Sequence, residues 1–150
     1  MRDAVRNSPA PARILLVDDN RLGLAARKSV LEELGHSITT AQHGQEALEL
    51  FSSGAFDLVV TDYRMPKMDG FELIKSIRAL APAPPIILIS GYAEALGMTE
   101  ANTGADAVIC KNANEVTHLV REVTRLLLRS AARKPSARQS ARPKAKRGTA

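Results

Sequence analysis

Five residues with chemically active side chains each stand directly after a short, mainly apolar run. They are Asp18 and Asp19 after residues 13–17, Asp62 after 58–61, Ser90 after 85–89 and Lys111 after 107–110. Neighbouring carboxylates repel one another unless a cation neutralises them, and an all-oxygen cluster suits a hard divalent ion, above all Mg²⁺. A metal-bound carboxylate nucleophile, a hydroxyl and an ammonium group are what phosphoryl transfer to an aspartate requires, because that reaction depends on positioning and charge neutralisation.

The apolar runs predict buried strands of a parallel sheet. Residues 58–60 are continuously apolar rather than alternating, which is typical of a strand covered on both faces. Pro66 prevents this strand from continuing, because proline lacks an N–H group and disfavours helical angles at Met65. We therefore expect Asp62 on the rim of the sheet, where open α/β sheets place their chemistry.

Helical patterns between the strands complete the fold prediction. Helices are expected over about 21–34, 45–53, 71–81, 114–129 and, least regularly, 92–103, with a polar edge strand at 37–41. The apolar stripe of the first helix is predicted to comprise Leu22, Ala25, Ala26, Val30 and Leu34. This alternation favours an α/β fold, a flavodoxin-like (βα)5 doubly wound parallel sheet of strand order 2-1-3-4-5. In that order the first and third strands are adjacent, which brings Asp18, Asp19 and Asp62 together.

Residues 13–128 resemble the receiver domains of two-component response regulators. The resemblance rests on Asp18-Asp19, Asp62, the stretch Met65-Pro66-Lys67-Met68-Asp69-Gly70, Ser90 and Lys111. Each motif alone is unspecific, whereas all of them in order, at the expected strand ends, point to this family. The stretch Ser90-Gly91-Tyr92 is also similar to receivers fused to hybrid sensor kinases.

The resemblance implies a division of roles among the carboxylates. Asp62 would be the phosphoacceptor, and Asp19 and Asp62 would bind Mg²⁺ together with the backbone carbonyl of Arg64. Asp18 would act mainly through metal-bound water. The phosphoryl group would come from a histidine kinase or a histidine phosphotransfer protein. The domain would not be an enzyme beyond catalysing its own phosphorylation and dephosphorylation.

Ser90 and Lys111 complete the implied site, and three further positions modify it. Ser90 would hydrogen-bond the phosphoryl group and move with it, while Lys111 would pair with a phosphoryl oxygen. Val108 stands where the family usually carries an aromatic switch residue, and Tyr92 is the expected replacement. Asn112 stands where the family usually has a proline joined by a cis bond, which costs a non-proline residue roughly 2.5–4 kcal/mol. Either that strain is tolerated here or the loop differs.

Charge is distributed unevenly along the chain. Residues 1–128 contain 13 Lys and Arg against 16 Asp and Glu, whereas residues 129–150 contain eight Lys and Arg and no acid. Spaced by Ala, Ser, Pro and Gly, these cations cannot bury enough apolar surface to order themselves. We therefore predict a disordered N-terminal arm at 1–12, a receiver domain at 13–128 and a disordered basic tail at 129–150. With a single cysteine and no run of transmembrane length, we expect a cytoplasmic protein without membrane contact.

Two functions of different classes fit these features. The first is a stand-alone receiver that signals by protein–protein contact through segment 92–128, as a monomer or a phosphorylation-dependent dimer. A phosphate sink or shuttle would use the same residues. The alternative is a phosphorylation-controlled, non-specific nucleic-acid binder using the tail, which nevertheless lacks an aromatic to stack on bases and a helix to enter a groove. A metal-dependent phosphatase of related topology would need Asp-x-Asp where residues 18–20 read Asp-Asp-Asn.

Each of these residues also has a purely structural interpretation. An aspartate at a strand end often caps the following turn, a serine before glycine is an ordinary turn residue, and a lysine can simply be solvated. These interpretations suit single sites, and five sites in register favour the functional one. His36, His43 and His118 form no metal-binding spacing and are predicted to be surface or capping residues.

Overall fold

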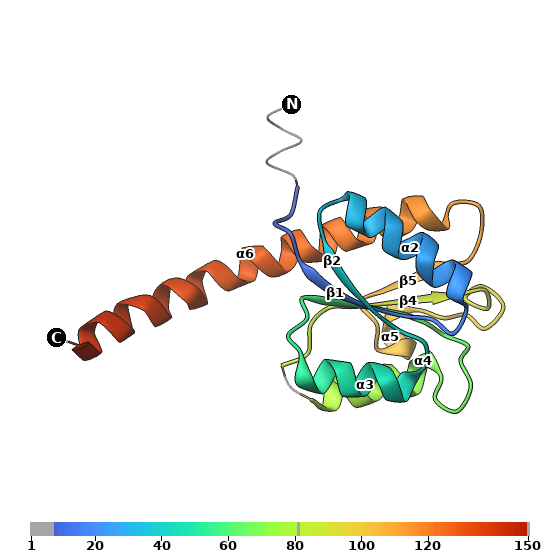
Figure 1. Cartoon of the computed structure of the whole chain (residues 1–150), viewed down its shortest axis with the longest axis horizontal. Coiled ribbons are helices and arrows are strands. Elements are labelled where there is room, and N and C mark those ends of the chain that lie inside the picture. The colour runs from blue at the N-terminus through green and yellow to red at the C-terminus, as the bar shows by residue number, and fades with distance from the viewer. Residues whose placement is uncertain (1–7, 81, 150) are drawn as a thin grey trace.

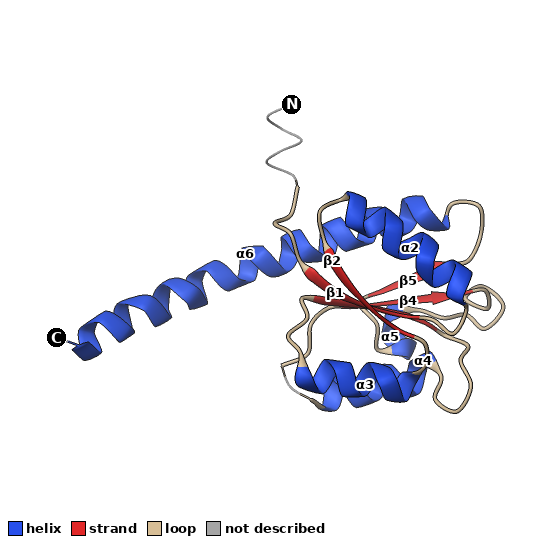
Figure 2. Cartoon of the chain, in the orientation of Figure 1, coloured by secondary structure: helices blue, strands red, loops and turns tan. Residues whose placement is uncertain are grey.

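The computed structural model describes the backbone of residues 8–80 and 82–149, and the side chains of this part as far as residue 133. Within it, strands and helices alternate along the chain (Figure 1, Figure 2). The strands are β1 (Arg13–Val17), β2 (Ser37–Ala41), β3 (Leu58–Asp62), β4 (Ile86–Ser90) and β5 (Ala107–Cys110). The helices are α2 (Arg21–Glu33), α3 (Gly44–Ser53), α4 (Gly70–Ala79), α5 (Glu100–Thr103) and α6 (Glu115–Thr149).

The five strands form one parallel sheet in the order β2-β1-β3-β4-β5. This order confirms the predicted flavodoxin-like arrangement. Val17 lies opposite Thr61, and Ser90 lies opposite Cys110, so the strands end nearly level with one another. The residues that end or follow β1, β3, β4 and β5 therefore emerge at one edge, here called the carboxyl edge. The edge at which the strands begin is called the amino edge.

Helices cover both faces of the sheet, with α2 and α6 on one side and α3, α4 and α5 on the other (Figure 1, Figure 2). Successive strand residues point to opposite faces. Leu16 and Val60 accordingly pack in the layer under α2 and α6, whereas Leu15 and Val59 pack in the layer under α3 and α4. Both layers need apolar side chains, which explains why these strands are continuously apolar.

Helix α2 turns a different face to the sheet from the one that the sequence indicates. The predicted stripe included Leu22 and Leu34, but these are 84% and 45% exposed. The buried residues are Leu24, Arg27 and Leu31, which have the i, i+3, i+7 spacing of a single helical face. The prediction was wrong because it relied on apolar residues alone, whereas Arg27 is buried with its charge neutralised by Asp18 and Glu115.

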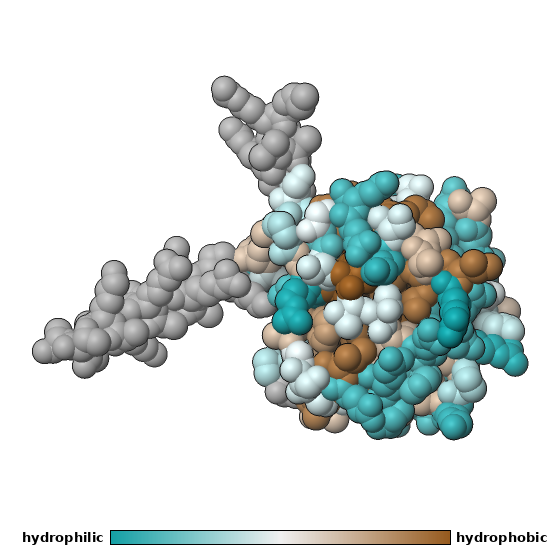
Figure 3. Space-filling model, viewed as in Figure 1, coloured by the Kyte–Doolittle hydropathy of each residue, from teal (hydrophilic) through white to brown (hydrophobic). Residues whose placement is uncertain are grey.

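Side chains cap the starts of the longer helices that follow β1, β2 and β3. The acceptors are the side chains of Asn20 for α2, His43 for α3 and Asp69 for α4. His43 therefore has the capping role predicted for it. Asp69 also forms a reciprocal capping box with Glu72, which sets the start of α4 firmly after the loop from β3. Hydrophilic residues cover the outer side of α3 in Figure 3, as expected of an amphipathic helix packed on a sheet.

Segment 92–103 is mostly turn, and only Glu100–Thr103 is helical. Gly97 adopts φ +58, a left-handed conformation that interrupts a helix. Thr99 then starts α5 by accepting a hydrogen bond from the N–H of Asn102. The helix predicted over 92–103 is therefore wrong except for its last turn, because Gly97, Asn102 and Thr103 have low helix propensity.

Helix α6 is longer than predicted, because its backbone remains helical to Thr149 instead of ending near Arg129. The predicted tail boundary at 129 therefore falls inside a continuous helical backbone, and the disorder of residues 129–150 stays a prediction. Alanine, arginine, lysine and glutamine in this stretch favour helix, whereas Pro135 and Pro143 each lack the N–H group that a helical hydrogen bond requires. Figure 1 shows this half of α6 leaving the domain. No helix in the described part of the chain is both long and apolar enough to cross a membrane.

The N-terminal arm joins the fold before β1 begins. Ala12 is buried, its N–H donates to Nδ1 of His36 at 3.1 Å, and its carbonyl accepts from the N–H of Ser37 at 2.9 Å. His36 is itself 5% exposed, so its prediction as a surface or capping residue is wrong. It is buried because the backbone of the incoming arm supplies its hydrogen bond. Of the predicted disordered arm at 1–12, residues 1–7 lie outside the described residues.

Candidate functional site

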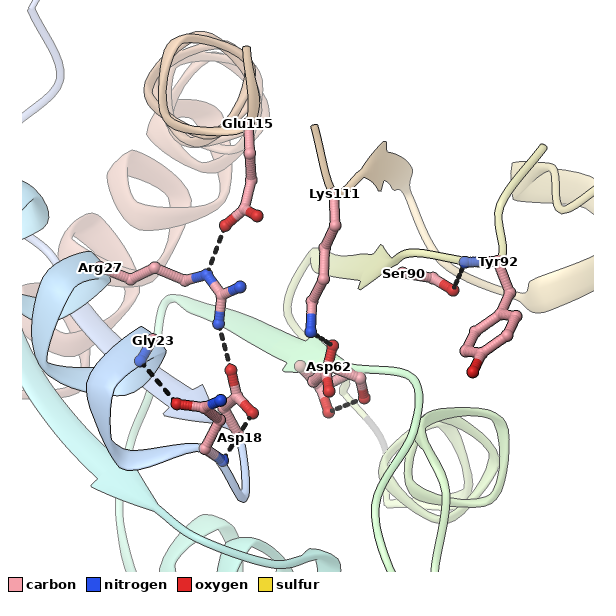
Figure 4. A network of polar contacts seen from close by, with 10 residues as sticks. Asp18, Gly23, Arg27, Asp62, Ser90, Tyr92, Lys111 and Glu115 are labelled. Carbon is pink, nitrogen blue, oxygen red and sulfur yellow. Dashed lines mark hydrogen bonds and ion pairs between the residues drawn. The ribbon is translucent and has the colours of Figure 1, made fainter. Parts of the chain in front are cut away.

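The three predicted carboxylates meet at the carboxyl edge of the sheet. Asp18 and Asp19 follow β1, and Asp62 ends β3, the neighbouring strand. One oxygen from each lies within 4.8 Å of the others, an arrangement that could hold a metal ion. Asp18 and Asp62 are buried and Asp19 is exposed, so the cluster opens to solvent on one side. We call this cluster of Asp18, Asp19 and Asp62 the acid pocket, and Figure 4 shows two of its members, Asp18 and Asp62.

Lys111 reaches the acid pocket from the end of β5. Its Nζ lies 2.7 Å from Oδ1 of Asp62. Burial raises the pKa of Asp62, the hydrogen bond and charge of Lys111 lower it, and the charge of Asp18 raises it again, with a net upward shift. Asn112, which stands where the family usually has proline, does not displace Lys111. The backbone N–H of Lys111 donates to the Ser90 carbonyl at 3.1 Å and fixes the residue beside β4. The Asn112 side chain instead accepts from the N–H of Asn114 at 2.8 Å and shapes the loop into α6.

Ser90 ends β4 at the same edge and is buried. Its Oγ accepts a hydrogen bond from the N–H of Tyr92 at 2.9 Å (Figure 4). A hydroxyl in this position keeps its own hydrogen for another acceptor. Ser90 can therefore donate to an oxygen at the pocket without breaking the turn after β4.

The ring of Tyr92 lies beside the loop after Asp62. Arg64 donates a hydrogen bond to the Tyr92 hydroxyl at 2.6 Å, and its Cζ lies 5.3 Å from the centre of the same ring. Tyr63 meets the ring edge-on, with ring centroids 6.3 Å apart. Tyr92 nevertheless remains 40% exposed. Arg64 and Tyr92 thus form a direct pair at the surface. Each stands two positions after a residue of the predicted site, Asp62 and Ser90 respectively.

The loop from β3 to α4 folds tightly around the carboxyl end of Asp62. The N–H of Gly70 donates to the carbonyl of Tyr63 at 2.7 Å. A Cβ atom on Gly70 would lie 2.6 Å from the carbonyl oxygen of Asp62, closer than atoms can approach. Lys67 adopts φ +69, the left-handed conformation that a sharp reversal requires. The Met65–Gly70 motif therefore serves to hold the backbone that carries Asp62.

Arg27 is a pocket residue that sequence reasoning missed. It projects from α2 with a side chain 7% exposed, and its guanidinium forms an ion pair with Oδ2 of Asp18. Its Nε donates to Oε2 of Glu115, at the start of α6, at 2.7 Å. Burial lowers the pKa of Arg27, but the hydrogen bonds and charges of Glu115 and Asp18 outweigh burial and raise it. The only signal in the sequence is the position of Arg27 between Leu24 and Leu31 on one helical face.

Val108, the other predicted switch residue, lies elsewhere on β5. It is half-buried, pairs in register with Leu88, and lines a surface hollow between β5 and α6 together with His118 and Arg121. Its side chain is too short to take part in an aromatic switch. The structure therefore brings Asp18, Asp19, Asp62 and Lys111 together, sets Ser90 at the same edge, and leaves Val108 outside the acid pocket.

Known proteins of similar sequence are large signalling proteins. The gliding motility regulatory protein of Myxococcus xanthus is 37% identical over 131 residues, which is 84% of this chain and 17% of that protein. The aerobic respiration control sensor protein ArcB of Escherichia coli is 35% identical over 107 residues, 69% of this chain and 14% of that protein. The chain thus spans less than a fifth of the length of these curated relatives.

Solved structures of similar fold are covered by this chain over nearly their whole length. The response regulator protein TrrA of Thermotoga maritima, crystallised in complex with Mg²⁺-BeF, is 36% identical with a TM-score of 0.69, covering 76% of this chain and 97% of that one. A CheY-like response regulator receiver domain protein of Methanospirillum hungatei is 30% identical with a TM-score of 0.74, covering 83% and 99%. The family model of the response regulator receiver domain matches residues 14–124. With the acid pocket, the sheet order and these matches in agreement, the chain belongs to the response regulator receiver domain family.

Proposed function

We propose that this protein is a phosphoacceptor module of a two-component phosphorelay, with Asp62 as the residue that takes the phosphoryl group. The observation that carries the proposal is the setting of Asp62, which is 4% exposed, crowded by two further carboxylates and contacted by Lys111 at 2.7 Å. A carboxylate in such a setting is fixed in position and needs positive charge. Phosphoryl transfer is limited by those two requirements.

The donor set of the acid pocket fits Mg²⁺. Asp19 and Asp62, with the backbone carbonyl of Arg64, would hold the ion directly, and Asp18 would hold it through water. Asp18 suits an indirect role, because both of its oxygens already accept hydrogen bonds, from Arg27 and from the N–H of Asn20. When bound, Mg²⁺ neutralises the carboxylates and the charge that develops on the transferred phosphoryl oxygens.

The residues of the chain then divide the transfer between them. A carboxylate oxygen of Asp62 attacks phosphorus, an O–P bond forms, and the P–N bond to the donor imidazole breaks, with the leaving nitrogen taking a proton. Lys111 moves from Asp62 to a phosphoryl oxygen and keeps the pocket neutral. Ser90 donates its hydroxyl hydrogen to another phosphoryl oxygen. The donor is a histidine kinase or a histidine phosphotransfer protein, both of which offer a phosphorylated imidazole.

The Arg64–Tyr92 pair would control both the lifetime of the phosphorylated state and the switch that it triggers. Water that attacks the phosphorylated Asp62 would have to pass Arg64 and Tyr92. These two side chains are joined by a 2.6 Å hydrogen bond. Movement of Ser90 toward the phosphoryl group would pull on the Tyr92 N–H, whose hydrogen bond its Oγ accepts. Tyr92 would take over the switching role that Val108 cannot perform. Segment 92–128 would carry the signal to a protein target, or the protein would act as a phosphate sink or shuttle.

Intact mass after incubation with a small acyl-phosphate donor tests the proposal. The native chain should gain one phosphoryl group in the presence of Mg²⁺ and none without it. Asp62→Asn should gain none. Asp69→Asn is the matched control, because asparagine also caps helices and Asp69 lies outside the acid pocket. An unmodified native chain, or an equal adduct on Asp62→Asn, would refute Asp62 as the phosphoacceptor.

Phosphorylation-controlled nucleic-acid binding is a second candidate, favoured by the course of α6. The tail forms a helix that leaves the domain, and residues 129–150 carry eight Lys and Arg without an acid. A helical tail supports this candidate, because a helix is an element that can enter a groove. Binding to a DNA duplex should weaken steeply between 50 and 200 mM salt, by about a thousandfold for six phosphate contacts. A salt-independent affinity, or equal affinity after removal of residues 134–150, would exclude this function.

A further inference from the structure

We infer that Arg27 couples the occupancy of the acid pocket to the start of α6, acting as a positioning residue that Asp18 and Glu115 share. It is attached to the pocket on one side and to α6 on the other, and it is nearly inaccessible to solvent. The inference concerns residues 27 and 115 of this chain and goes beyond the transfer reaction. It rests on the proposed function only in requiring that Mg²⁺ enters the acid pocket.

The contacts of Arg27 link three elements. Its guanidinium bonds Oδ2 of Asp18, the residue directly after β1, and its Nε bonds Oε2 of Glu115, the first residue of α6, at 2.7 Å (Figure 4). The exposed fractions of the three side chains are 7% for Arg27, 1% for Asp18 and 18% for Glu115. Ion pairs so well shielded from water respond strongly to a change in charge nearby.

The charge balance of the pocket depends on this arrangement. Three carboxylates, Asp18, Asp19 and Asp62, face two cations, Arg27 and Lys111. The charge of Arg27 also extends to the phosphoacceptor, since it contributes to lowering the pKa of Asp62, whose net shift is upward because of burial. Glu115 in turn offsets Arg27 from the opposite side. The positive charge that Arg27 presents to the pocket is therefore set by a residue of α6.

A divalent cation in the pocket competes with Arg27 for the negative charge of Asp18. The guanidinium then depends more on Glu115, which tightens the first turn of α6 onto α2. Linkage is reciprocal, so whatever strengthens the hold of Glu115 on Arg27 also favours the cation. Helix α6 is the element that leaves the domain, and its first residue thereby responds to the state of the pocket.

The Mg²⁺ dissociation constant of the full-length chain, measured by calorimetry, tests the coupling. Glu115→Gln leaves Arg27 with Asp18 as its remaining charged partner and so makes the pocket more positive. We expect Mg²⁺ to bind about fivefold more weakly, a typical size for coupling between sites. Glu122→Gln is the matched control, because it breaks another α6 ion pair, the 2.6 Å contact with Arg125, which does not involve the pocket. Its dissociation constant should equal that of the native chain.

Arg27→Met completes a double-mutant cycle. Without the guanidinium, Mg²⁺ should bind more tightly than to the native chain, and adding Glu115→Gln should change nothing further. Amide NMR signals of residues 114–118 should shift on Mg²⁺ addition in the native chain and not in Arg27→Met. If the Arg27 variants fail to fold, the amide shifts of residues 114–118 at saturating Mg²⁺ are compared between the native chain and Glu115→Gln. The coupling predicts that the shifts are lost in Glu115→Gln, and their persistence would overturn it.

The outcomes separate the coupling from the proposed function. A native chain that binds no Mg²⁺ contradicts the proposed function. A native chain that binds Mg²⁺ with the same dissociation constant as Glu115→Gln overturns the coupling and leaves the function standing. An equal effect of Glu115→Gln with and without Arg27 also overturns it, because the effect would then bypass the guanidinium.

Discussion

The two edges of the sheet hold their ionisable groups in opposite ways. At the amino edge, His36 accepts the N–H of Ala12 at 3.1 Å, and a carboxylate oxygen of Asp57 accepts the N–H of Arg13 at 2.8 Å. Burial lowers the pKa of His36, partly offset by the charge of Asp57. At the carboxyl edge, three carboxylates lie within 4.8 Å of one another and burial raises the pKa of Asp62.

The amino edge is stabilised by its polar contacts, whereas the carboxyl edge holds charges that are not balanced within the fold. At the amino edge each of these polar groups meets a complementary partner, so the arrangement contributes to stability as it stands. At the carboxyl edge like charges are crowded, and the repulsion is relieved only by added positive charge. Substitutions of the same type should therefore have different, and in one case opposite, effects at the two edges.

Two glycines give the largest expected contrast. Gly70→Ala at the carboxyl edge would place a Cβ 2.6 Å from the Asp62 carbonyl oxygen and 2.8 Å from Cδ1 of Leu88, and should cost about 3 kcal/mol of unfolding free energy. Gly35→Ala, just before β2, has nothing within 4 Å but a φ of +98, and should cost about 1 kcal/mol. Urea denaturation measures both. Equal losses would show that the carboxyl edge is no more tightly packed than the amino edge.

Loss of the pocket ammonium should slow phosphoryl uptake. Lys111→Gln removes the charge that lies 2.7 Å from Asp62, and the rate of uptake from an acyl-phosphate donor should fall about a hundredfold. Lys28→Gln is the control, because Lys28 forms an exposed pair with Glu32 on the outside of α2. The time course of intact mass measures both rates. A rate for Lys111→Gln close to that of the control would remove the lysine from the transfer.

Neutralising one aspartate at each edge should change stability in opposite directions when Mg²⁺ is absent. The folded-state pKa of Asp62 is raised, so the folded protein loses stability as pH rises through that pKa, and ionised Asp62 destabilises the fold at pH 7. Asp62→Asn should then stabilise the fold by on the order of 1 kcal/mol. Asp57→Asn weakens the charged acceptor for the Arg13 N–H and should destabilise by about 1 kcal/mol. Thermal unfolding at pH 7 with a chelator gives both signs, and two changes of the same sign would contradict the contrast.

Lowering the pH should reduce the stability of the fold at the amino edge through protonation of His36. This is the smallest of the effects predicted here. The folded-state pKa of His36 is lowered by burial, so its contribution to stability is complete above the unfolded value of about 6.5 and is lost as pH falls toward the folded-state pKa. The native Tm should drop by a few degrees between pH 7 and pH 5.5. His36→Gln, which keeps an acceptor for the Ala12 N–H, should show a smaller drop. An identical pH dependence in both proteins would assign the acid sensitivity to other groups.

Much of the pocket could be predicted because it depends on strand ends. The runs before Asp18, Asp62 and Lys111 are mainly apolar, so their strands were expected to be covered on both faces and parallel. Parallel strands end at a common edge, and the pairing of β1 with β3 at that edge brings the three predicted carboxylates together. Arg27 could not be found in this way, because its burial depends on Asp18 and on Glu115, 88 residues further along the chain.

The sequence alone was enough to locate the strands along the chain and the residues at their carboxyl ends, because hydrophobic pattern acts locally. The tertiary structure decided which face of α2 is buried, that His36 lies inside, and that Lys111 contacts Asp62 despite Asn112. These features depend on charges and backbone groups that meet only after folding, since a buried ion or imidazole is stable only where its partner already stands.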